Sequence, residues 1–327
     1  MTRRAILHTG HSKTATTYLQ HFLHLNEDLL ARQGYHLPAD FTGLGYPNYR
    51  DIVAAGRTFS GNAWPLFEAL RRGEKLTPFE TLLGSDGSLI LSTEMLFYYV
   101  HSTRKIVAFL SSLGYQVQIL AYVPLYDRGV VSSYVQNVRN HGLHAGVLEF
   151  LDSASMRYCM YGTILSELRG YLPQTRIDFR QFRREALLGG RIEDDFVAHA
   201  APELEASTMR RPTHGLNPSL RLEILELLRV FNRIGYTPGM QAARKMEEEL
   251  GQEARDTLFH FYFTETVAQA VRERFADDKA LLLSQVDWPQ SDHEAWSFER
   301  FTPSPASIDP HLLLRALDEL MRLLAEE

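Results

Sequence analysis

Cysteine is almost absent from this chain of 327 residues, which contains Cys159 alone. A single cysteine excludes an internal disulfide framework and is typical of a reducing compartment. Long apolar runs are missing too, because no stretch of about 18 apolar residues occurs, and we expect no membrane span. The segment before Lys13 is too short and too polar for a signal peptide. We therefore expect a soluble, cytoplasmic protein.

The chain also lacks an excess of basic residues. Its formal net charge is −6, which argues against a general nucleic-acid-binding protein. Two pairs of histidines have a three-residue spacing, at positions 8 and 11 and at 141 and 144, but no further ligand cluster accompanies them, so we expect no metal site. Repeats, low-complexity tracts and obvious linkers are missing as well, and we expect one domain over residues 1–327.

Short apolar segments alternate with helical patterns along the first part of the chain. They predict four buried strands: "RRAILHT" (3–9), "GSLILSTEML" (87–96), "YQVQILAYV" (115–123) and "TRIDFRQF" (175–182). This alternation predicts an α/β fold with a mostly parallel sheet flanked by helices. We expect the sheet core over about 1–200 and a helical part over about 201–327. A long helix of that part should start with Asn217 as its N-cap and Pro218 at its first position.

The segment "ILHTGHSKTATTYLQHFL" (6–23) reads as an apolar run, a small polar turn and an amphipathic helix. This is the layout of a phosphate-binding loop, because the turn exposes backbone N–H groups at the positive end of a helix. The Gly-Lys-Ser/Thr ending of a Walker A loop is missing. Gly10 allows a sharp turn, Lys13 supplies a charge, and Thr16 and Thr17 supply hydroxyls. The other interpretation is an ordinary turn with a solvated lysine and N-capping threonines.

The same segment resembles the 5′-phosphosulfate-binding loop of sulfotransferases, whose bacterial members carry a His-x-Gly-x-x-Lys-Thr-Gly-Thr-Thr-x-x-Gln pattern. The matching residues are His8, Gly10, Lys13, Thr14, Thr16, Thr17 and Gln20. Ala15 departs from the pattern, since the family usually has glycine there, and alanine restricts the backbone to more ordinary dihedrals. Further segments are similar to the same family in the same order, up to about residue 235: "ILSTEML", "QFRREALLGGRIEDDFVAHA" and "GLNPSLRLEILELLRVFN".

The resemblance implies a P-loop nucleoside-triphosphatase-like sulfotransferase fold. It also implies transfer of a sulfonate, without a metal, from 3′-phosphoadenosine-5′-phosphosulfate to a hydroxyl or amine. The residues that would hold the donor's 5′-phosphate are Ser12, Lys13, Thr14, Ala15, Thr16 and Thr17. Lys13 would stabilise the leaving oxygen, and Glu94 would be the general base at the carboxyl end of a strand. The alternative for Glu94 is a glutamate that complements the dipole at the start of a helix.

The segment "AYVPLYDRGVVSSYVQNVRN" (121–140) resembles the part of the family that binds the donor's 3′-phosphate. Ser132 falls at the serine position, but the expected arginine is replaced by Pro124, which has neither a charge nor a backbone donor. Arg128 is our candidate substitute, because residues 128 and 132 share one face if both are helical. The other candidates are Arg139, Arg210 and Arg211.

Two other functions stay open. The chain could be a degenerate nucleotide-binding module without transfer activity, which Pro124 favours and the retained Lys13 and Glu94 oppose. A small-molecule phosphotransferase is disfavoured, because a clear Walker B aspartate is missing too. The sequence does not identify the acceptor, which could be a small molecule, a lipid or a carbohydrate, and it leaves the oligomeric state open.

Overall fold

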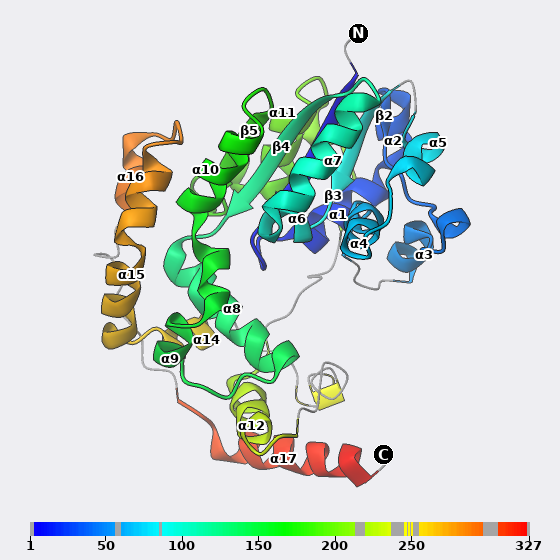
Figure 1. Cartoon of the computed structure of the whole chain (residues 1–327). Helices are drawn as coiled ribbons and strands as arrows, with labels where there is room; N and C mark the ends of the chain where they lie inside the picture. The colour runs from blue at the N-terminus through cyan, green and yellow to red at the C-terminus, as the bar shows by residue number, and fades with distance from the viewer. Residues whose placement is uncertain are drawn as a thin grey trace. The chain divides into compact units, whose positions relative to one another are not determined.

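The computed structural model of the chain (Figure 1) describes residues 3–55, 60–84, 87–212, 220–236, 245–246, 248, 250, 255–296 and 307–325. These residues group into two compact units. Unit 1 falls within Met1–Leu125, Met160–Asn217 and Asp278–Trp288, and unit 2 within Tyr126–Cys159, Pro218–Asp277 and Pro289–Glu327. The helix start predicted at Asn217 and Pro218 lies outside the described residues. That the chain forms one domain stays a prediction.

Unit 1 contains a five-stranded, all-parallel sheet in the order β2-β3-β1-β4-β5. The strands are β1 (Arg4–Gly10), β2 (Tyr35–His36), β3 (Ser88–Ser92), β4 (Gln116–Val123) and β5 (Arg176–Gln181). In the central strand β1, Ile6 pairs with Ile90 of β3 and Leu7 with Ile119 of β4, and all four side chains are fully buried. The predicted α/β class and the four predicted strands are confirmed, but the strand predicted over 87–96 ends at Ser92, and Met95 and Leu96 belong to a helix.

The sequence did not predict β2. Its two residues lie at the start of a stretch, 35–64, that has no firm periodicity and that we interpret from sequence as partly helical. Tyr35 and His36 become a strand only through their pairing with Ser88 and Leu89 of β3. A strand of two residues is too short for a period of two to be recognised in the sequence.

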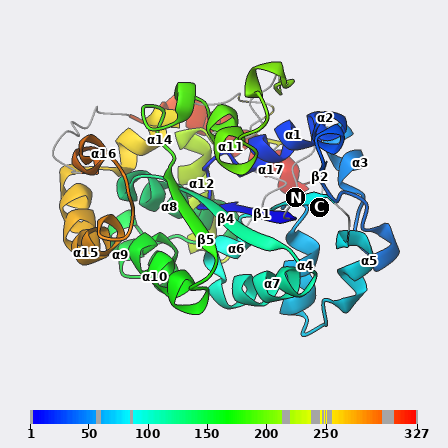
Figure 2. The same cartoon turned by 90° about the horizontal axis from the view of Figure 1, so that it is seen from above.

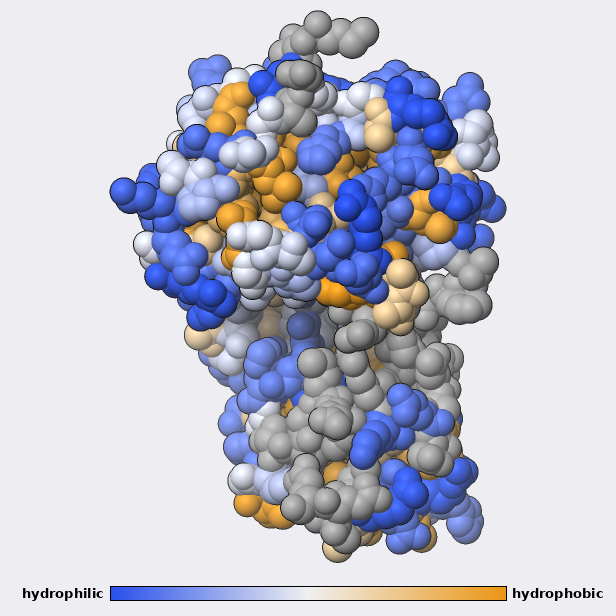
Figure 3. Space-filling view, turned by 90° about the vertical axis from the view of Figure 1, so that its right-hand side faces the viewer, coloured by the Kyte–Doolittle hydropathy of each residue, from blue (hydrophilic) through white to orange (hydrophobic). Residues whose placement is uncertain are grey.

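Helices cover both faces of the sheet. Unit 1 contains α1 (Thr16–Leu25), α2 (Glu27–Arg32), α3 (Tyr49–Ala54), α4 (Trp64–Arg71), α5 (Glu80–Leu83), α6 (Met95–Tyr98), α7 (Val100–Ser112), α10 (Tyr161–Tyr171) and α11 (Ile192–Ala200). Seen along the sheet, α1 and α11 lie on one side and α7 and α10 on the other (Figure 2). Hydrophilic and apolar side chains are interspersed on the surface that carries α3, α4 and α5 (Figure 3).

The described residues of unit 2 form helices and the loops between them, but no strand. Its helices are α8 (Tyr126–His141), α9 (Val147–Leu151), α12 (Leu222–Arg233), α14 (Arg255–Tyr262), α16 (Gln290–Ala295) and α17 (Pro310–Ala325), and α15 (Glu265–Leu283) begins in it. In its core, the Tyr126 ring stacks on Phe275 with 5.0 Å between the centroids. Cys159 is buried there, with its Sγ 3.7 Å from Ser133 Oγ. Beyond Gln181 the described residues form no strand, as the predicted helical carboxy-terminal part requires.

Among the described residues, none of the helices combines the length and the apolar character that crossing a membrane requires. The same part of the chain contains no group of three His, Cys, Asp or Glu side chains that could hold a metal ion.

Candidate anion-binding site

The candidate site is the turn between β1 and α1. The turn leaves the sheet at Gly10, and the His11 N–H donates to the Tyr122 carbonyl of β4 at 3.0 Å. A Cβ on Gly10 would lie 2.8 Å from both Tyr122 O and Thr14 Oγ1. Glycine is therefore required here because the loop passes close to the backbone of β4, rather than because of an unusual dihedral.

Two non-glycine residues of the turn adopt the left-handed conformation. Lys13 has φ 66°, and Ala15, the N-cap of α1, has φ 59° and ψ 24°. Left-handed residues within a turn point successive N–H groups toward one side, which creates a concave anion-binding backbone. From the sequence we expect ordinary backbone dihedrals at Ala15, but the structure has this residue in the left-handed conformation. The loop holds this alanine in a conformation that costs about 1–2 kcal/mol for a residue with a Cβ.

The side chains of the turn divide into two groups. Thr14 Oγ1 donates back to the His11 carbonyl at 2.7 Å and so closes the turn internally. Thr16 is buried, and its Oγ1 has no hydrogen-bond partner among the described residues. Lys13 is exposed, and Thr17 is half-buried in the first turn of α1. A buried hydroxyl without a partner fits a site whose partner is a ligand.

Glu94 lies at the neighbouring strand end. It follows β3 by two residues, and the Thr93 N–H donates to the His8 carbonyl of β1 at 3.1 Å, which brings the two strand ends together. Glu94 is the N-cap of α6, but its side chain makes no capping hydrogen bond. Burial raises the pKa of the Glu94 carboxyl, and the Lys13 charge lowers it in part. The fold thus places the predicted base and the predicted lysine within electrostatic range.

Tyr98 is a member of the site that sequence reasoning missed. Its hydroxyl accepts the Ser12 N–H at 2.5 Å and also shares a short hydrogen bond with the Ser12 hydroxyl. Tyr98 is the last residue of α6 and lies four residues after Glu94. That spacing puts the two side chains on one helical face. This four-residue spacing could have pointed to Tyr98 from the sequence, but only if a helix starting at Glu94 had been predicted.

Beneath the loop, a buried polar cluster joins the ends of β1 and β3. His8 Nδ1 lies 2.8 Å from Ser92 Oγ, and the Gln20 amide donates to the same oxygen at 3.2 Å. The Ser92 N–H donates to Asn62 Oδ1 at 2.7 Å. Desolvation lowers the pKa of His8 to about 3 and that of His11 to about 4. His8 and Gln20 thus support the loop as neutral groups.

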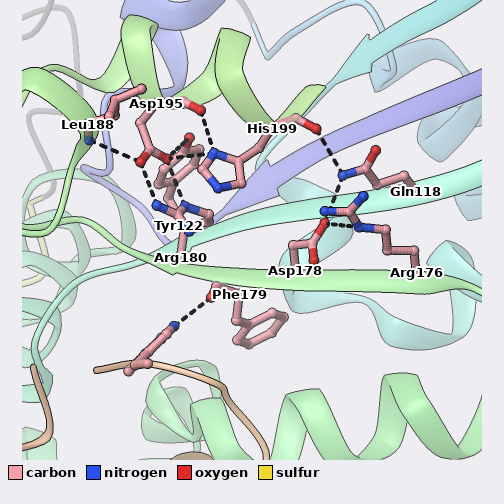
Figure 4. Close-up of polar contacts among 10 residues, drawn as sticks. Gln118, Tyr122, Arg176, Asp178, Phe179, Arg180, Leu188, Asp195 and His199 are labelled. Carbon is pink, nitrogen blue, oxygen red and sulfur yellow. Dashed lines mark hydrogen bonds and ion pairs between the residues drawn. The ribbon is translucent and has the colours of Figure 1, made fainter. Parts of the chain in front are cut away.

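A second buried network is centred on Asp195 of the "GGRIEDDF" segment (189–196) (Figure 4). The Asp195 carboxylate accepts two hydrogen bonds from Arg180, from Nε at 2.8 Å and from Nη2 at 2.6 Å. It also accepts the Tyr122 hydroxyl at 2.8 Å and the Leu188 N–H at 3.2 Å. Burial raises the pKa of the Tyr122 hydroxyl well above its usual range, and the Asp195 charge adds to this effect. Asp195 thus holds β4, β5 and the glycine turn together.

The predicted contacts to the 3′-phosphate lie in unit 2. Arg128 and Ser132 are both in α8, one turn apart, which meets the condition under which they share one face. The Arg128 guanidinium carbon lies 3.8 Å from the centroid of the Phe259 ring, and the backbone N–H of Arg128 donates to Asp127 Oδ1 at 2.6 Å. Ser132 Oγ is buried and has no hydrogen-bond partner in the described part of the chain. Pro124 is buried and directly follows β4 in unit 1.

The other candidate arginines differ in their contacts. Arg139 belongs to α8, like Arg128. In unit 1, an Arg210 guanidinium N–H donates to the Leu25 carbonyl. Arg211 forms ion pairs with Glu193 at 3.0 Å and Asp194 at 2.8 Å. It also lines a cavity of about 580 Å³ beside α11. Because the carboxylates of Glu193 and Asp194 already neutralise Arg211, it is a weaker candidate for binding a phosphate.

The chain has a distant likeness to a solved structure. No protein-family model matches the chain, and no curated protein matches it either. Among solved structures, the chain is similar to the crystal structure of a sulfotransferase from Alicyclobacillus acidocaldarius. The identity is 12%, the alignment covers 90% of this chain and 99% of that chain, and the TM-score is 0.42. A superposition at this level does not establish a shared fold or a shared chemistry.

Proposed function

We propose that the chain is a sulfotransferase that moves a sulfonate from 3′-phosphoadenosine-5′-phosphosulfate to a hydroxyl or amine. The acceptor would belong to a small molecule, a lipid or a carbohydrate. One observation carries the proposal. A lysine-bearing turn with left-handed backbone at Lys13 and Ala15 lies within electrostatic range of the carboxyl group of the half-buried Glu94. The turn suits a phosphate and the carboxylate suits an acceptor proton, and neither role needs a metal.

The donor, when bound, supplies an activated sulfonate whose sulfur–oxygen bond to the 5′-phosphate breaks as the acceptor atom bonds to sulfur. The Lys13 ammonium and the loop N–H groups stabilise the negative charge left on the phosphate oxygen. Glu94 takes the acceptor proton, and its raised pKa brings it closer to the pH at which a base works best. The neutral His8 and His11 are bonded within the protein, so neither is proposed as the base.

Within the same proposal, Arg128 and Ser132 bind the 3′-phosphate. Their support is the shared face of α8, the exposed position of Arg128 and the buried Ser132 hydroxyl without a partner in the described residues. An arginine provides planar, bidentate contacts that Pro124 cannot make. The second candidate, a nucleotide-binding module without transfer, is favoured by Pro124 itself.

Calorimetric titration with adenosine 3′,5′-bisphosphate tests the proposal. We expect Lys13→Ala to abolish measurable binding, because the charge at the loop is lost. The matched control is Lys105→Ala, which removes an exposed lysine from α7 of the same unit and should leave the affinity unchanged. Arg128→Ala should weaken the bisphosphate and leave adenosine 5′-monophosphate unaffected.

Three outcomes would change the conclusion. Binding of ATP that requires magnesium would replace the proposal by a phosphotransferase. Bisphosphate binding without transfer to any of a broad panel of hydroxyl and amine acceptors would leave the non-enzymatic module. Bisphosphate binding that survives Lys13→Ala would remove the loop from the site.

A further inference from the structure

The Tyr98 hydroxyl engages the backbone N–H and the side-chain hydroxyl of Ser12 in the candidate loop. It accepts the Ser12 N–H at 2.5 Å and shares a hydrogen bond with the Ser12 hydroxyl. Ser12 is buried and Tyr98 is half-buried. The Tyr98 ring meets His11 edge-on, with 5.9 Å between the centroids, and Phe97 in the same way at 5.6 Å.

The Tyr98 hydroxyl accepts from the Ser12 backbone N–H, a group that could otherwise donate to an anion. A phosphate at the start of a helix is held by backbone N–H groups of the preceding turn. The N–H groups of His11 and Thr14 donate to carbonyls of Tyr122 and His11. The Ser12 N–H is committed to Tyr98 in the same way, so the Tyr98 oxygen stands where one phosphate oxygen would accept.

The same tyrosine is connected to the proposed base. Glu94 is the N-cap of α6 and Tyr98 is its last residue, one turn further along the helix. The helix itself is anchored, because Leu96 and Phe97 are fully buried and Thr103 Oγ1 donates to the Leu96 carbonyl at 2.6 Å. Glu94 and Tyr98 thus lie at the two ends of the same short, anchored helix.

We infer that Tyr98 is a positioning residue whose hydroxyl competes with an anion for the Ser12 N–H and is displaced when the anion binds. Its release frees the Ser12 N–H for a phosphate oxygen. The identity of the anion rests on the proposed function, whereas the competition between the Tyr98 hydroxyl and an anion does not. A simple anion as well as a nucleotide can therefore be used to test this competition.

The first measurement is hydrogen exchange of the Ser12 amide in the ligand-free protein. Tyr98→Phe removes the hydroxyl and keeps the ring, so the Ser12 amide should exchange about three- to tenfold faster, the factor that one lost hydrogen bond gives. The control is Tyr99→Phe, whose ring packs on Phe67 and is 43% exposed, and it should not change the exchange. Equal exchange in the wild type and in Tyr98→Phe would overturn the inference.

The second measurement is the affinity for inorganic pyrophosphate and for adenosine 3′,5′-bisphosphate. Tyr98→Phe should bind pyrophosphate about three- to tenfold more tightly than the wild type, because the Ser12 N–H no longer has to be released. Pyrophosphate that binds more tightly while the bisphosphate binds to neither protein supports Tyr98 and refutes the proposed donor. Unchanged or weaker pyrophosphate binding, or none to either protein, refutes the role of Tyr98.

Discussion

Lys13 and Glu94 act on each other from the ends of neighbouring strands. Lys13 lies in the turn after β1 and Glu94 just beyond β3, and the Lys13 charge opposes the rise that burial causes in the Glu94 pKa. Eighty-one residues of sequence separate them, and the parallel pairing of β1 with β3 brings them together. A cation for the leaving group and a base for the acceptor are the two charges that the proposed transfer requires.

Replacing Glu94 by glutamine should lower turnover by about 10²–10⁴, the usual contribution of a general base. Glutamine keeps the shape of the side chain but cannot accept the acceptor proton. Steady-state rates measure the turnover, and calorimetry with the bisphosphate should give an unchanged affinity. Glu80→Gln, which changes an exposed glutamate of α5, is the control. Near-wild-type turnover in Glu94→Gln would show that another group is the base.

The same substitution should change how stability depends on pH. Because the folded pKa of Glu94 is raised, its contribution to stability is fully present below the pKa of the unfolded chain and is lost as pH rises through the folded pKa. Glutamine does not titrate, so the melting temperature of Glu94→Gln relative to the wild type should be higher at pH 8 than at pH 4. Thermal unfolding across this range measures the difference. A difference that does not vary with pH would contradict the raised pKa.

Replacing Ala15 by glycine should raise the free energy of unfolding by up to about 1 kcal/mol. Relief of the left-handed conformation contributes about 1–2 kcal/mol, and the greater freedom of glycine in the unfolded chain offsets part of it. Ala108→Gly, at an exposed position inside α7, should instead lower the stability by about 1 kcal/mol. Urea denaturation measures both. A loss of stability in Ala15→Gly would mean that the loop does not strain this residue.

Replacing Thr16 by valine should change the affinity for the ligand without lowering the stability of the fold. The Thr16 Oγ1 is buried without a partner in the described residues, so valine of nearly the same shape should leave stability unchanged or slightly higher. Affinity for the bisphosphate should fall about ten- to a hundredfold, because one hydrogen bond to a charged phosphate is lost. Denaturation and calorimetry on the same sample check the two effects. A marked loss of stability would show that the hydroxyl serves the folded protein itself.

Replacing Asp195 by asparagine should destabilise the protein by about 3 kcal/mol, because a buried, paired charge loses its partner. Asp195 is fully buried and the Arg180 side chain is 25% exposed, so water cannot fully replace the lost contact. Glu185→Gln is the control, since its carboxylate is 69% exposed and lies 3.7 Å from Arg183. It should change stability by less than about 0.5 kcal/mol. Equal effects in a denaturant titration would contradict the structural role of Asp195.

Much of the fold follows from local patterns. The apolar runs around Ile6, Ile90 and Ile119 are long enough to be recognised as buried strands, and each is fully buried in the sheet. Arg128 and Ser132 are four residues apart, a spacing that puts two side chains on one face of a helix, and both lie in α8. Patterns of this kind depend on neighbours within a few residues, so the sequence reports them directly.

The contacts that complete the site join residues far apart in the chain. The Ser12–Tyr98 hydrogen bonds span 86 residues, and no periodicity points to them. The left-handed Ala15 runs against the preference of alanine, because the turn between β1 and α1 imposes it. β2 exists through its pairing with β3. The amino-acid pattern was thus sufficient for the four longer strands, the turn after the first of them and its lysine, whereas the packing of the sheet was needed to form β2, to set Tyr98 on Ser12 and to bring Glu94 near Lys13. Local periodicity depends on adjacent residues, so it can be recognised in the sequence. The free energy that brings distant residues together comes from burying the whole sheet at once.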